Sequence, residues 1–455
     1  MQHRPKYHFL PEKNWMNDPN ATIFFEGTHH LFYQYNPTDW HWGNLHWGHA
    51  TSKDLLHWEH QPIALTPDIE NKETDCYSGC SYIHNGKIEL FYTSVGKEDH
   101  CQHDGSQQWV AVTEDGVRWK QIKDNPVMKI EPEFNGGKKL TEWRDPFVFQ
   151  WKGKTYALVA GIVDNKYSAV HIYTSEDMRQ WTYVNEFFRN NCAKEVMECP
   201  NLVVFGDKVL FIHSYWDLRV LHYYVGTINE DCQLEVYNKG DVDYGDFFAS
   251  QISFDDKGRT YLWGWLREDP RRGLYTDGEW AGVQAIPRVI SINEDNELVM
   301  QRLPEFENLR REKEAITLEN FSGERIFETK SNTAEIKAVI KSDEVFTIRM
   351  LASDDGREYT DVVFNPREGT YYAPMEESSL LKEVDKRPIL GYFKKSENHE
   401  VAIDILLDGS VAEIFVDDNS AMALRIYPSL EGKNMSFLSK NNVEKASIEI
   451  YEIEL

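Results

Sequence analysis

Three acidic residues stand in short motifs that could carry acid–base or nucleophilic chemistry: Asp18 in WMNDPN, Asp145 in WRDP and Glu198 in MECP. Hydrolysis of a glycosidic bond uses two carboxyl groups, one that protonates the departing oxygen and one that attacks or supports the anomeric carbon. Met197 and Cys199 flank Glu198, and this low polarity favours a raised pKa, as a general acid requires. The acids therefore suggest glycoside hydrolysis, if the fold brings them together.

A repeat in the N-terminal two thirds of the chain supplies elements that could position these acids. Five segments each begin with Gly, continue with a few polar residues and then form a short apolar or aromatic strand. A strand-and-turn unit that recurs in this way, with almost no helical periodicity, is typical of β-propeller blades. Five units predict five blades, with the last ending near Pro287–Pro304. The glycines are Gly27, Gly86, Gly153, Gly206 and Gly258.

A second motif interlocks with the first and places Asp four residues before Trp, in SKDLLHW, TEDGVRW and SEDMRQW. A blade cannot bury its faces alone and must stack on its neighbours. We therefore expect Trp58, Trp119 and Trp181 to pack between blades rather than to bind a ligand.

The repeat also aligns the acids with one another. Counting eight residues back from the glycine of blades two to five gives Ser78, Asp145, Glu198 and Ser250, and counting nine back from the first glycine gives Asp18. If the strand at this position is the innermost of its blade, the five residues lie at equivalent points around one axis. Two of the carboxyl groups could then lie about 5–5.5 Å apart, which is the separation of a retaining mechanism.

Other interpretations of these residues stay open. Three acids in a funnel could bind Ca²⁺, although no DxDxDG loop is present. Each acid could instead cap a turn or pair with an arginine, as Arg144 could with Asp145. A zinc site can also be imagined, but its ligand spacings fit no common pattern, and we expect no metal and no cofactor. Its members would be Cys76, Cys80, His100, Cys101 and His103.

Beyond Lys313 the aromatic-rich units give way to alternating strands, and VAIDILLDGSVAEIFVDD predicts a hairpin that turns at Asp408-Gly409. The predicted fold class is all-β, a five-bladed β-propeller followed by a C-terminal β-sandwich. The expected domains are a catalytic propeller over 1–304, a charged, helix-permissive linker over 305–320 and a sandwich over 321–455. The sandwich is expected to have a structural role and offers sheet edges for a possible homo-oligomer.

Bulk properties exclude several classes of partner. The formal net charge of −26 disfavours nucleic acid and anionic membranes, which both select basic surfaces. The first eleven residues hold no apolar signal core, and no run of about 18 apolar residues occurs. The six cysteines are sparse and suggest reduced thiols. Together these features predict a cytoplasmic protein without a nucleic-acid or membrane partner, and the acid motifs indicate a small carbohydrate as its partner.

Aromatic side chains cluster near the same strand ends as the acids. Sugars present apolar C–H faces, which aromatic rings and a few amides recognise well. Trp42, Tyr77 and Trp265 are the aromatic residues expected to contact substrate, and Trp42 and Trp265 lie among glycines at blade edges.

The motifs WMNDPN, WRDP and MECP resemble the three signature boxes of glycoside hydrolase family 32, the β-fructofuranosidases. The likeness continues through the stretches at 30–65, YSGC (77–80), 246–254, WAGVQAIPR (280–288) and LLDGSVAEIFVDD (406–418), and covers nearly the whole chain. It implies a five-bladed propeller with a β-sandwich. It also implies that Asp18 is the nucleophile, Glu198 the general acid/base and Asp145 the transition-state stabiliser. Implied sugar contacts are Asn17, Gln34, Trp42, Ser78, Arg144 and Trp265.

The chain departs from the family pattern at two positions. Ala21 stands where glycine usually follows NDPN, and Cys80 replaces the second serine of SGS. If position 21 requires a positive φ, alanine would be strained there, and we expect a small backbone adjustment rather than lost activity.

The expected function is the exo-acting, retaining release of terminal β-D-fructofuranosyl units from sucrose or short fructans. Fructosyl transfer to another sugar and non-catalytic carbohydrate binding on the same scaffold are the alternatives. A phosphate-specific site would need basic residues at the funnel rim, and the sequence alone places none there.

Overall fold

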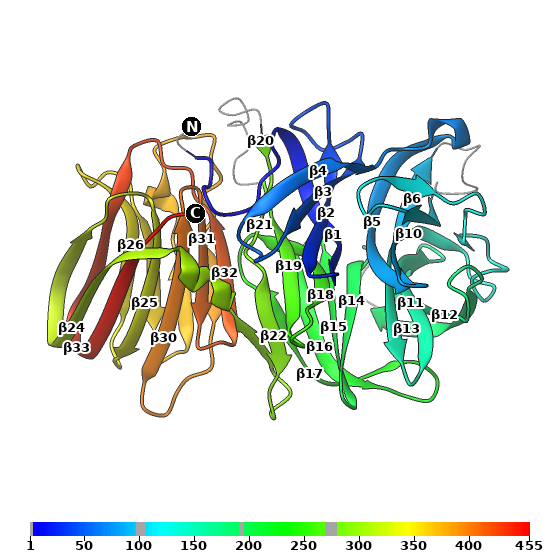
Figure 1. The fold of residues 1–455 in the computed structure, drawn as a ribbon. Coiled ribbons are helices and arrows are strands. Elements are labelled where there is room, and N and C mark those ends of the chain that lie inside the picture. The colour runs from blue at the N-terminus through cyan, green and yellow to red at the C-terminus, as the bar shows by residue number, and fades with distance from the viewer. Residues whose placement is uncertain (1–2, 97–105, 191–194, 269–279) are drawn as a thin grey trace.

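The computed structural model describes residues 3–96, 106–190, 195–268 and 280–455. It confirms the predicted fold class, because five four-stranded blades surround one axis and a folded C-terminal sheet packs beside them (Figure 1). Among these residues no helix has the length and apolar character needed to cross a lipid bilayer.

Each blade is a meander of antiparallel strands whose first strand lies innermost. The first strands of successive blades contact one another in a closed ring. The blades are β1 (Asn14–Phe25), β2 (Thr28–Asn36), β3 (His46–Ser52) and β4 (Trp58–Leu65); β5 (Glu73–His84), β6 (Lys87–Gly96), β7 (Ser106–Thr113) and β8 (Trp119–Gln121), with β9 (Met128–Lys129) beside β7; β10 (Leu140–Trp151), β11 (Lys154–Val163), β12 (Tyr167–Ser175) and β13 (Thr182–Asn190); β14 (Glu198–Phe205), β15 (Lys208–Tyr215), β16 (Val220–Ile228) and β17 (Leu234–Asp243); and β18 (Phe247–Phe254), β19 (Thr260–Leu266), β22 (Arg288–Ile292) and β23 (Leu298–Gln301).

The glycine of each repeat unit lies in the turn between the first and second strands of its blade. All five glycines have φ between 66° and 77°, a conformation that a residue without Cβ adopts at no steric cost. The ring is closed by the segment after β19, where β20 (Trp280–Ala281) pairs in parallel with β1 and β21 (Val283–Gln284) pairs with β19.

The tryptophans of the D-x-x-x-W motif pack between blades, as predicted. Each lies near the outer strand of its own blade and contacts an aromatic ring of the preceding blade. These apolar contacts between blades stabilise the propeller. The pairs are Trp58 with Trp263 (5.8 Å between ring centroids), Trp119 with Phe32 (5.3 Å) and Trp181 with Phe91 (5.6 Å).

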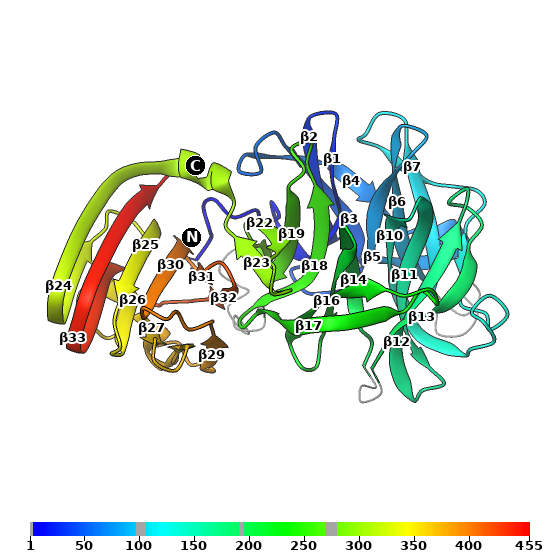
Figure 2. The ribbon, with the colours of Figure 1, turned by 90° about the horizontal axis from the view of Figure 1, so that it is seen from below.

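The C-terminal sheet folds over on itself because β33 (Gly432–Ile453) serves two layers, with its first half paired to β26 and its second half to β25. The two long strands β24 (Arg310–Glu328) and β33 form its outer side (Figure 2). Side chains from both layers share one core. The remaining strands are β25 (Thr333–Lys341), β26 (Phe346–Ser353), β27 (Thr360–Asn365), β28 (Thr370–Ala373), β29 (Ile389–Tyr392), β30 (Glu400–Asp408), β31 (Val411–Val416) and β32 (Ser420–Arg425). The predicted hairpin is confirmed as β30–β31.

The segment expected as a linker, 305–320, has a different structure. A 3-10 turn, η3 (Pro304–Leu309), leads directly into β24, which enters the C-terminal sheet at Arg310. Its charged residues are compatible with a strand because β24 pairs only with β33 and leaves most of its side chains in solvent.

Buried charges join the propeller to the C-terminal sheet. Arg288 on β22 donates to Asp243 on β17 at 2.7 Å and to Glu413 on β31 at 3.3 Å. His8, in the N-terminal segment, lies between Asp408 (3.0 Å) and the same Glu413 (3.1 Å). All five side chains are fully shielded from solvent, so each charge depends on its partners across the junction.

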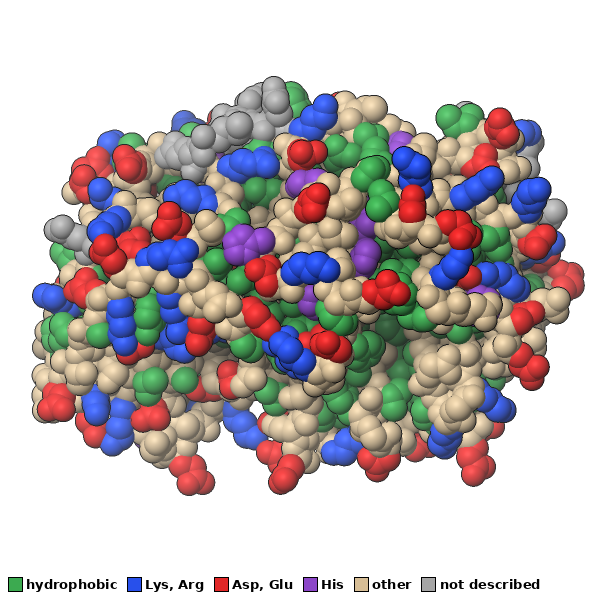
Figure 3. All heavy atoms as spheres, in the orientation of Figure 1, with side chains coloured by type: hydrophobic (Ala, Val, Ile, Leu, Met, Phe, Trp, Pro, Cys, Tyr) green, Lys and Arg blue, Asp and Glu red, His purple; other side chains and the backbone are tan. Residues whose placement is uncertain are grey.

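The outer surface carries both signs of charge. On the face turned to the viewer in Figure 3, basic and acidic side chains are interspersed over both domains, and hydrophobic side chains gather around a hollow over the propeller.

Candidate active site

A β-bulge interrupts each innermost strand of the propeller. The pairing register shifts once or twice along these strands, so that two residues stand opposite one. Bulges bend a strand and re-aim its side chains. The five residues predicted to be equivalent lie in or at the edge of these bulges, which places them at one level around the axis: Asp18, Ser78, Asp145, Glu198 and Ser250.

Several non-glycine residues at the bulges adopt positive φ, which L-residues rarely do outside constrained sites. Asp145 has φ +62°, Cys199 +47° and Ala21 +47°. Position 21 does require a positive φ, the condition raised from the sequence. Ala21 occupies a left-handed conformation within the second bulge of β1, between Asn20 and Ile23, and it is buried there.

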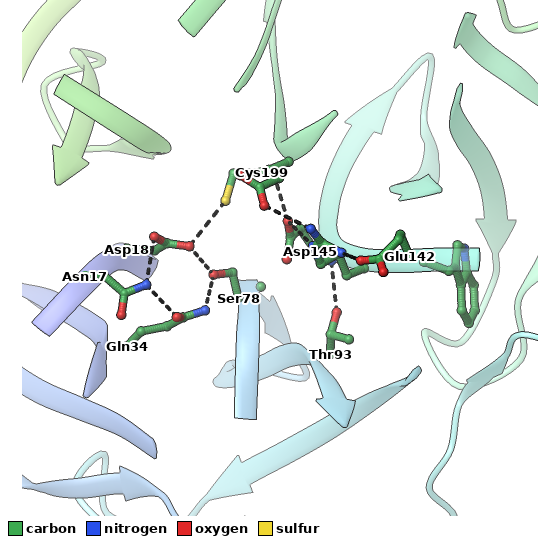
Figure 4. Close-up of polar contacts among 12 residues, drawn as sticks. Asn17, Asp18, Gln34, Ser78, Thr93, Glu142, Asp145 and Cys199 are labelled. Atoms are coloured by element: carbon green, nitrogen blue, oxygen red, sulfur yellow. Dashed lines mark hydrogen bonds and ion pairs between the residues drawn. The ribbon is translucent and has the colours of Figure 1, made fainter. Parts of the chain in front are cut away.

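Asp18 accepts hydrogen bonds on both carboxylate oxygens (Figure 4). Asn17 donates to Oδ1 at 3.0 Å and Ser78 donates to Oδ2 at 2.6 Å. Gln34 fixes both donors, because its Oε1 accepts from Asn17 and its Nε2 donates to Ser78 Oγ, each at 2.6 Å. Burial raises the pKa of Asp18 to about 6, although Ser78 acts to lower it.

Asp145 is tied to two other blades. Its Oδ2 accepts the backbone N–H of Cys199 on β14 at 2.9 Å, and its own N–H donates to Thr93 Oγ1 on β6 at 2.9 Å (Figure 4). Burial raises the pKa of Asp145 to about 6, while the Arg144 guanidinium acts to lower it.

Glu198 has a basic partner in space although it has none beside it in sequence. Arg144 Nη2 donates to Glu198 Oε1 at 2.9 Å, and the other arm of the same guanidinium donates to Glu142. Burial still dominates and raises the pKa of Glu198 to about 7. The raised pKa predicted for Glu198 is confirmed, and its carboxyl group is poised to hold a proton near neutral pH.

The thiol of Cys199 completes the cluster, since its Sγ lies 3.7 Å from Asp18 Oδ2. Cys199 thus contacts the carboxylates of two other blades, and Arg144 contacts the third acid. The acids on β1, β10 and β14 converge on one buried site, as the repeat predicted. Sequence reasoning missed two residues of this site. Thr93, which accepts from the Asp145 N–H, belongs to another blade, and Glu142, which accepts from Arg144, lies outside the aligned positions of the repeat.

The predicted aromatic contacts differ in exposure. Trp42 is 55% exposed and its ring lies 6.2 Å from that of Tyr77. Trp265 is only 3% exposed, because Trp216 stacks over it with ring centroids 6.3 Å apart. Trp216, 43% exposed, is an aromatic residue that sequence reasoning missed, since it stands in the β15–β16 turn outside the aligned positions.

The imagined zinc site lies partly outside the described residues, which include neither His100, Cys101 nor His103. Cys76 Sγ donates to Glu73 at 3.7 Å, and Cys80 Sγ accepts the Val148 N–H at 3.2 Å. Within the described ranges no group of three or more His, Cys, Asp or Glu side chains has an arrangement that could hold a metal ion.

Comparison with known proteins places this geometry in a family. The model of the glycosyl hydrolases family 32 N-terminal domain matches residues 8–302, and that of the family 32 C terminal matches residues 305–452. Sucrose-6-phosphate hydrolase of Escherichia coli is 28% identical over 462 residues, covering 96% of this chain and 92% of the relative. Levanase of Bacillus subtilis (strain 168) is 29% identical over 504 residues, covering 99% and 70%.

Solved structures agree with the fold. Fructan 1-exohydrolase IIa from Cichorium intybus matches with a TM-score of 0.87 at 21% identity, covering 100% of this chain and 98% of that one. The β-fructofuranosidase of Bombyx mori matches with a TM-score of 0.81 at 26% identity, covering 100% and 94%.

Proposed function

Because the chain belongs to glycosyl hydrolase family 32, whose members are β-fructofuranosidases, we propose that it releases terminal non-reducing β-D-fructofuranosyl units from sucrose or short fructooligosaccharides with retention of configuration. The observation that carries this proposal is the convergence of three buried carboxyl groups whose surroundings differ. Asp18 accepts hydrogen bonds from neutral donors, whereas Glu198 pairs with the Arg144 guanidinium and has the highest pKa of the three.

In the first step Glu198, protonated, donates its proton to the oxygen that leaves C2 of the fructosyl unit. Asp18, ionised, attacks C2 and forms a covalent fructosyl-enzyme. Asn17 and Ser78 hold the Asp18 carboxylate in place through the bonds to Oδ1 and Oδ2, so little reorganisation is needed before attack.

In the second step Glu198, now ionised, takes a proton from water, and the resulting hydroxide displaces Asp18 from C2. The fructose leaves with the β-configuration it had in the substrate, because two inversions have occurred. Arg144 stabilises the ionised Glu198 between the two steps through its 2.9 Å bond.

Asp145 takes no part in proton transfer in this scheme. Its carboxylate is held by the Cys199 N–H, and we assign it to hydroxyl groups of the fructosyl ring, where it stabilises positive charge that develops at C2. Gln34, Trp42 and Tyr77 complete the proposed sugar contacts, and Trp265 contributes by supporting Trp216.

The test is hydrolysis of sucrose, kestose, inulin and levan in the presence of methanol, with products identified by NMR. Free fructose together with methyl β-D-fructofuranoside is the expected result. Methyl α-D-fructofuranoside would refute retention. More kestose-type trisaccharide than free fructose at high sucrose concentration would show that the enzyme is a fructosyltransferase rather than a hydrolase. Asp18→Asn should abolish turnover, and near-normal activity in that variant would remove Asp18 as the nucleophile.

A further inference from the structure

A pocket of about 730 Å³ opens beside the carboxylate cluster, between blades three and four. Of the three proposed catalytic acids, only Glu198 lines it. A general acid gives its proton to the leaving oxygen, so the leaving group must lie on the Glu198 side of the cluster. If the proposed function is correct, this pocket receives the part of the substrate that departs.

The wall of the pocket is acidic. Glu142, Glu195 and Asp217 line it together with Glu198, whereas Arg144 is the single cation among its described lining residues. The guanidinium of Arg144 is already committed, because it donates to Glu142 and Glu198 and its Nε lies 3.9 Å from Asp145. Among the described residues that line the pocket, an entering anion meets like charges, and the cation present there, Arg144, is already paired.

The same pocket offers apolar surface that suits a neutral sugar. Trp216 leaves 43% of its surface exposed and Leu218 leaves 63% exposed, and both line the pocket. The ring of Trp216 is fixed by its stack on Trp265, with an angle of 5° between the ring planes. A rigid indole beside carboxylates provides a stacking face for C–H groups and acceptors for hydroxyl groups, which is the chemistry of an uncharged pyranose or furanose.

We propose that this pocket selects uncharged leaving groups, so that the chain hydrolyses sucrose and neutral fructooligosaccharides in preference to sucrose 6-phosphate. A phosphate monoester carries nearly two negative charges at pH 7, and like charges brought together at a binding surface discriminate strongly against the wrong ligand. This proposal rests on the proposed function and names the substrate class of the same site. It separates the chain from relatives whose name specifies sucrose 6-phosphate.

The test compares kcat/KM for sucrose and sucrose 6-phosphate in the wild-type enzyme and in the double variant Glu195→Gln/Asp217→Asn. We expect sucrose to be preferred by about tenfold or more, and the preference to shrink several-fold in the double variant. Raising ionic strength from about 0.01 M to about 1 M should also shrink it, since salt screens exposed charges. Glu26→Gln/Asp256→Asn removes two charges from the exposed β1–β2 and β18–β19 turns and should leave the preference unchanged.

The outcomes separate the two proposals. Equal or faster turnover of sucrose 6-phosphate would overturn the selection of neutral leaving groups while leaving fructoside hydrolysis intact. An enzyme that cleaves neither of these sugars, nor kestose, inulin or levan, would overturn the proposed function. Calorimetric titration with sucrose and sucrose 6-phosphate would then test the selectivity of the pocket. Binding of sucrose alone supports the selection, and equal binding of both sugars, or tighter binding of sucrose 6-phosphate, refutes it.

Discussion

The backbone N–H of Cys199 donates to Asp145 Oδ2 at 2.9 Å, a bond that links the inner strands of blades three and four. Both residues have positive φ, so the two bulges face each other in the conformation that brings this donor to this acceptor. The bond uses the main chain and is therefore indifferent to the side chain at position 199. The backbone of the propeller therefore sets the relative position of the acids, whereas neighbouring side chains such as Ser78 and Arg144 influence the pKa values of the acids.

The pH dependence of kcat/KM follows from two of these protonation states. Asp18, with a pKa of about 6, must be ionised to attack, and Glu198, with a pKa of about 7, must be protonated to act as an acid. The active form therefore dominates between these values, and we expect a bell-shaped profile with its maximum between about pH 6 and 7. An optimum above pH 8 would contradict these roles.

Arg144 should control the alkaline limb of that profile. Burial raises the pKa of Glu198 and the Arg144 charge lowers it, so Arg144→Gln should move the alkaline limb to higher pH while reducing kcat. Arg144→Lys is the matched control, because it keeps the charge but loses the two-armed contact with Glu142 and Glu198. It should reduce kcat with the limb nearly in place. If the alkaline limb lay at the same pH in both variants, the charge of Arg144 would not influence the pKa of Glu198.

Asp18→Asn should make the protein more stable at neutral pH although it removes activity. The folded-state pKa of Asp18 lies above its ordinary value, so folding is penalised as pH rises from about 4 through about 6, and the penalty is complete above that range. Replacing the carboxylate removes the penalty, which corresponds to about 1–3 kcal/mol. Thermal unfolding should show a higher Tm for the variant at pH 7.5 and a smaller gain at pH 4.5.

A matched control for that measurement is Asp207→Asn, in the exposed β14–β15 turn, which should change Tm little at either pH. A lower Tm for Asp18→Asn at pH 7.5 would show that the hydrogen bonds from Asn17 and Ser78 outweigh the cost of burying the charge.

His8 should contribute stability that disappears in alkali. Burial acts to lower its pKa, but hydrogen bonds to Asp408 and Glu413 outweigh burial and raise the pKa to about 9. The stabilisation is complete below about pH 6.5 and is lost as pH rises through about 9. His8→Gln should lower the Tm clearly at pH 6.5, because Asp408 and Glu413 lose a buried cation, and much less at pH 10. The exposed His57→Gln is the control; equal losses at both pH values for His8→Gln would exclude a charged His8.

The acids could be located from the sequence because the repeat fixes geometry as well as fold. In each inner strand the distance from the bulge to the turn glycine is nearly constant, so counting back from Gly153 or Gly206 reaches the level of Asp145 or Glu198. The hairpin that turns at Asp408 could be predicted for the same reason. Interactions of this kind lie within one supersecondary unit and produce a periodic pattern in the sequence.

Contacts between different blades produce no such periodic pattern in the sequence. Arg144 and Glu198 are 54 residues apart and belong to different blades, so nothing in the sequence joins them. Trp216 lies in a turn, where no strand pattern marks it, and it covers the Trp265 that was expected to face the sugar. The charged start of β24 was interpreted as a linker because an exposed strand paired on one edge only shows little of the alternation that marks a half-buried one.

The buried charges at the junction also determine where the chain cannot be divided. Separating the propeller from the C-terminal sheet near Arg310 would strip Glu413 from Arg288, and would leave Asp408 and Glu413 facing each other without His8. Either fragment would therefore contain buried charges that have lost their partners. The two domains therefore differ in architecture but unfold as one cooperative unit. Calorimetry of the intact chain should record a single unfolding transition.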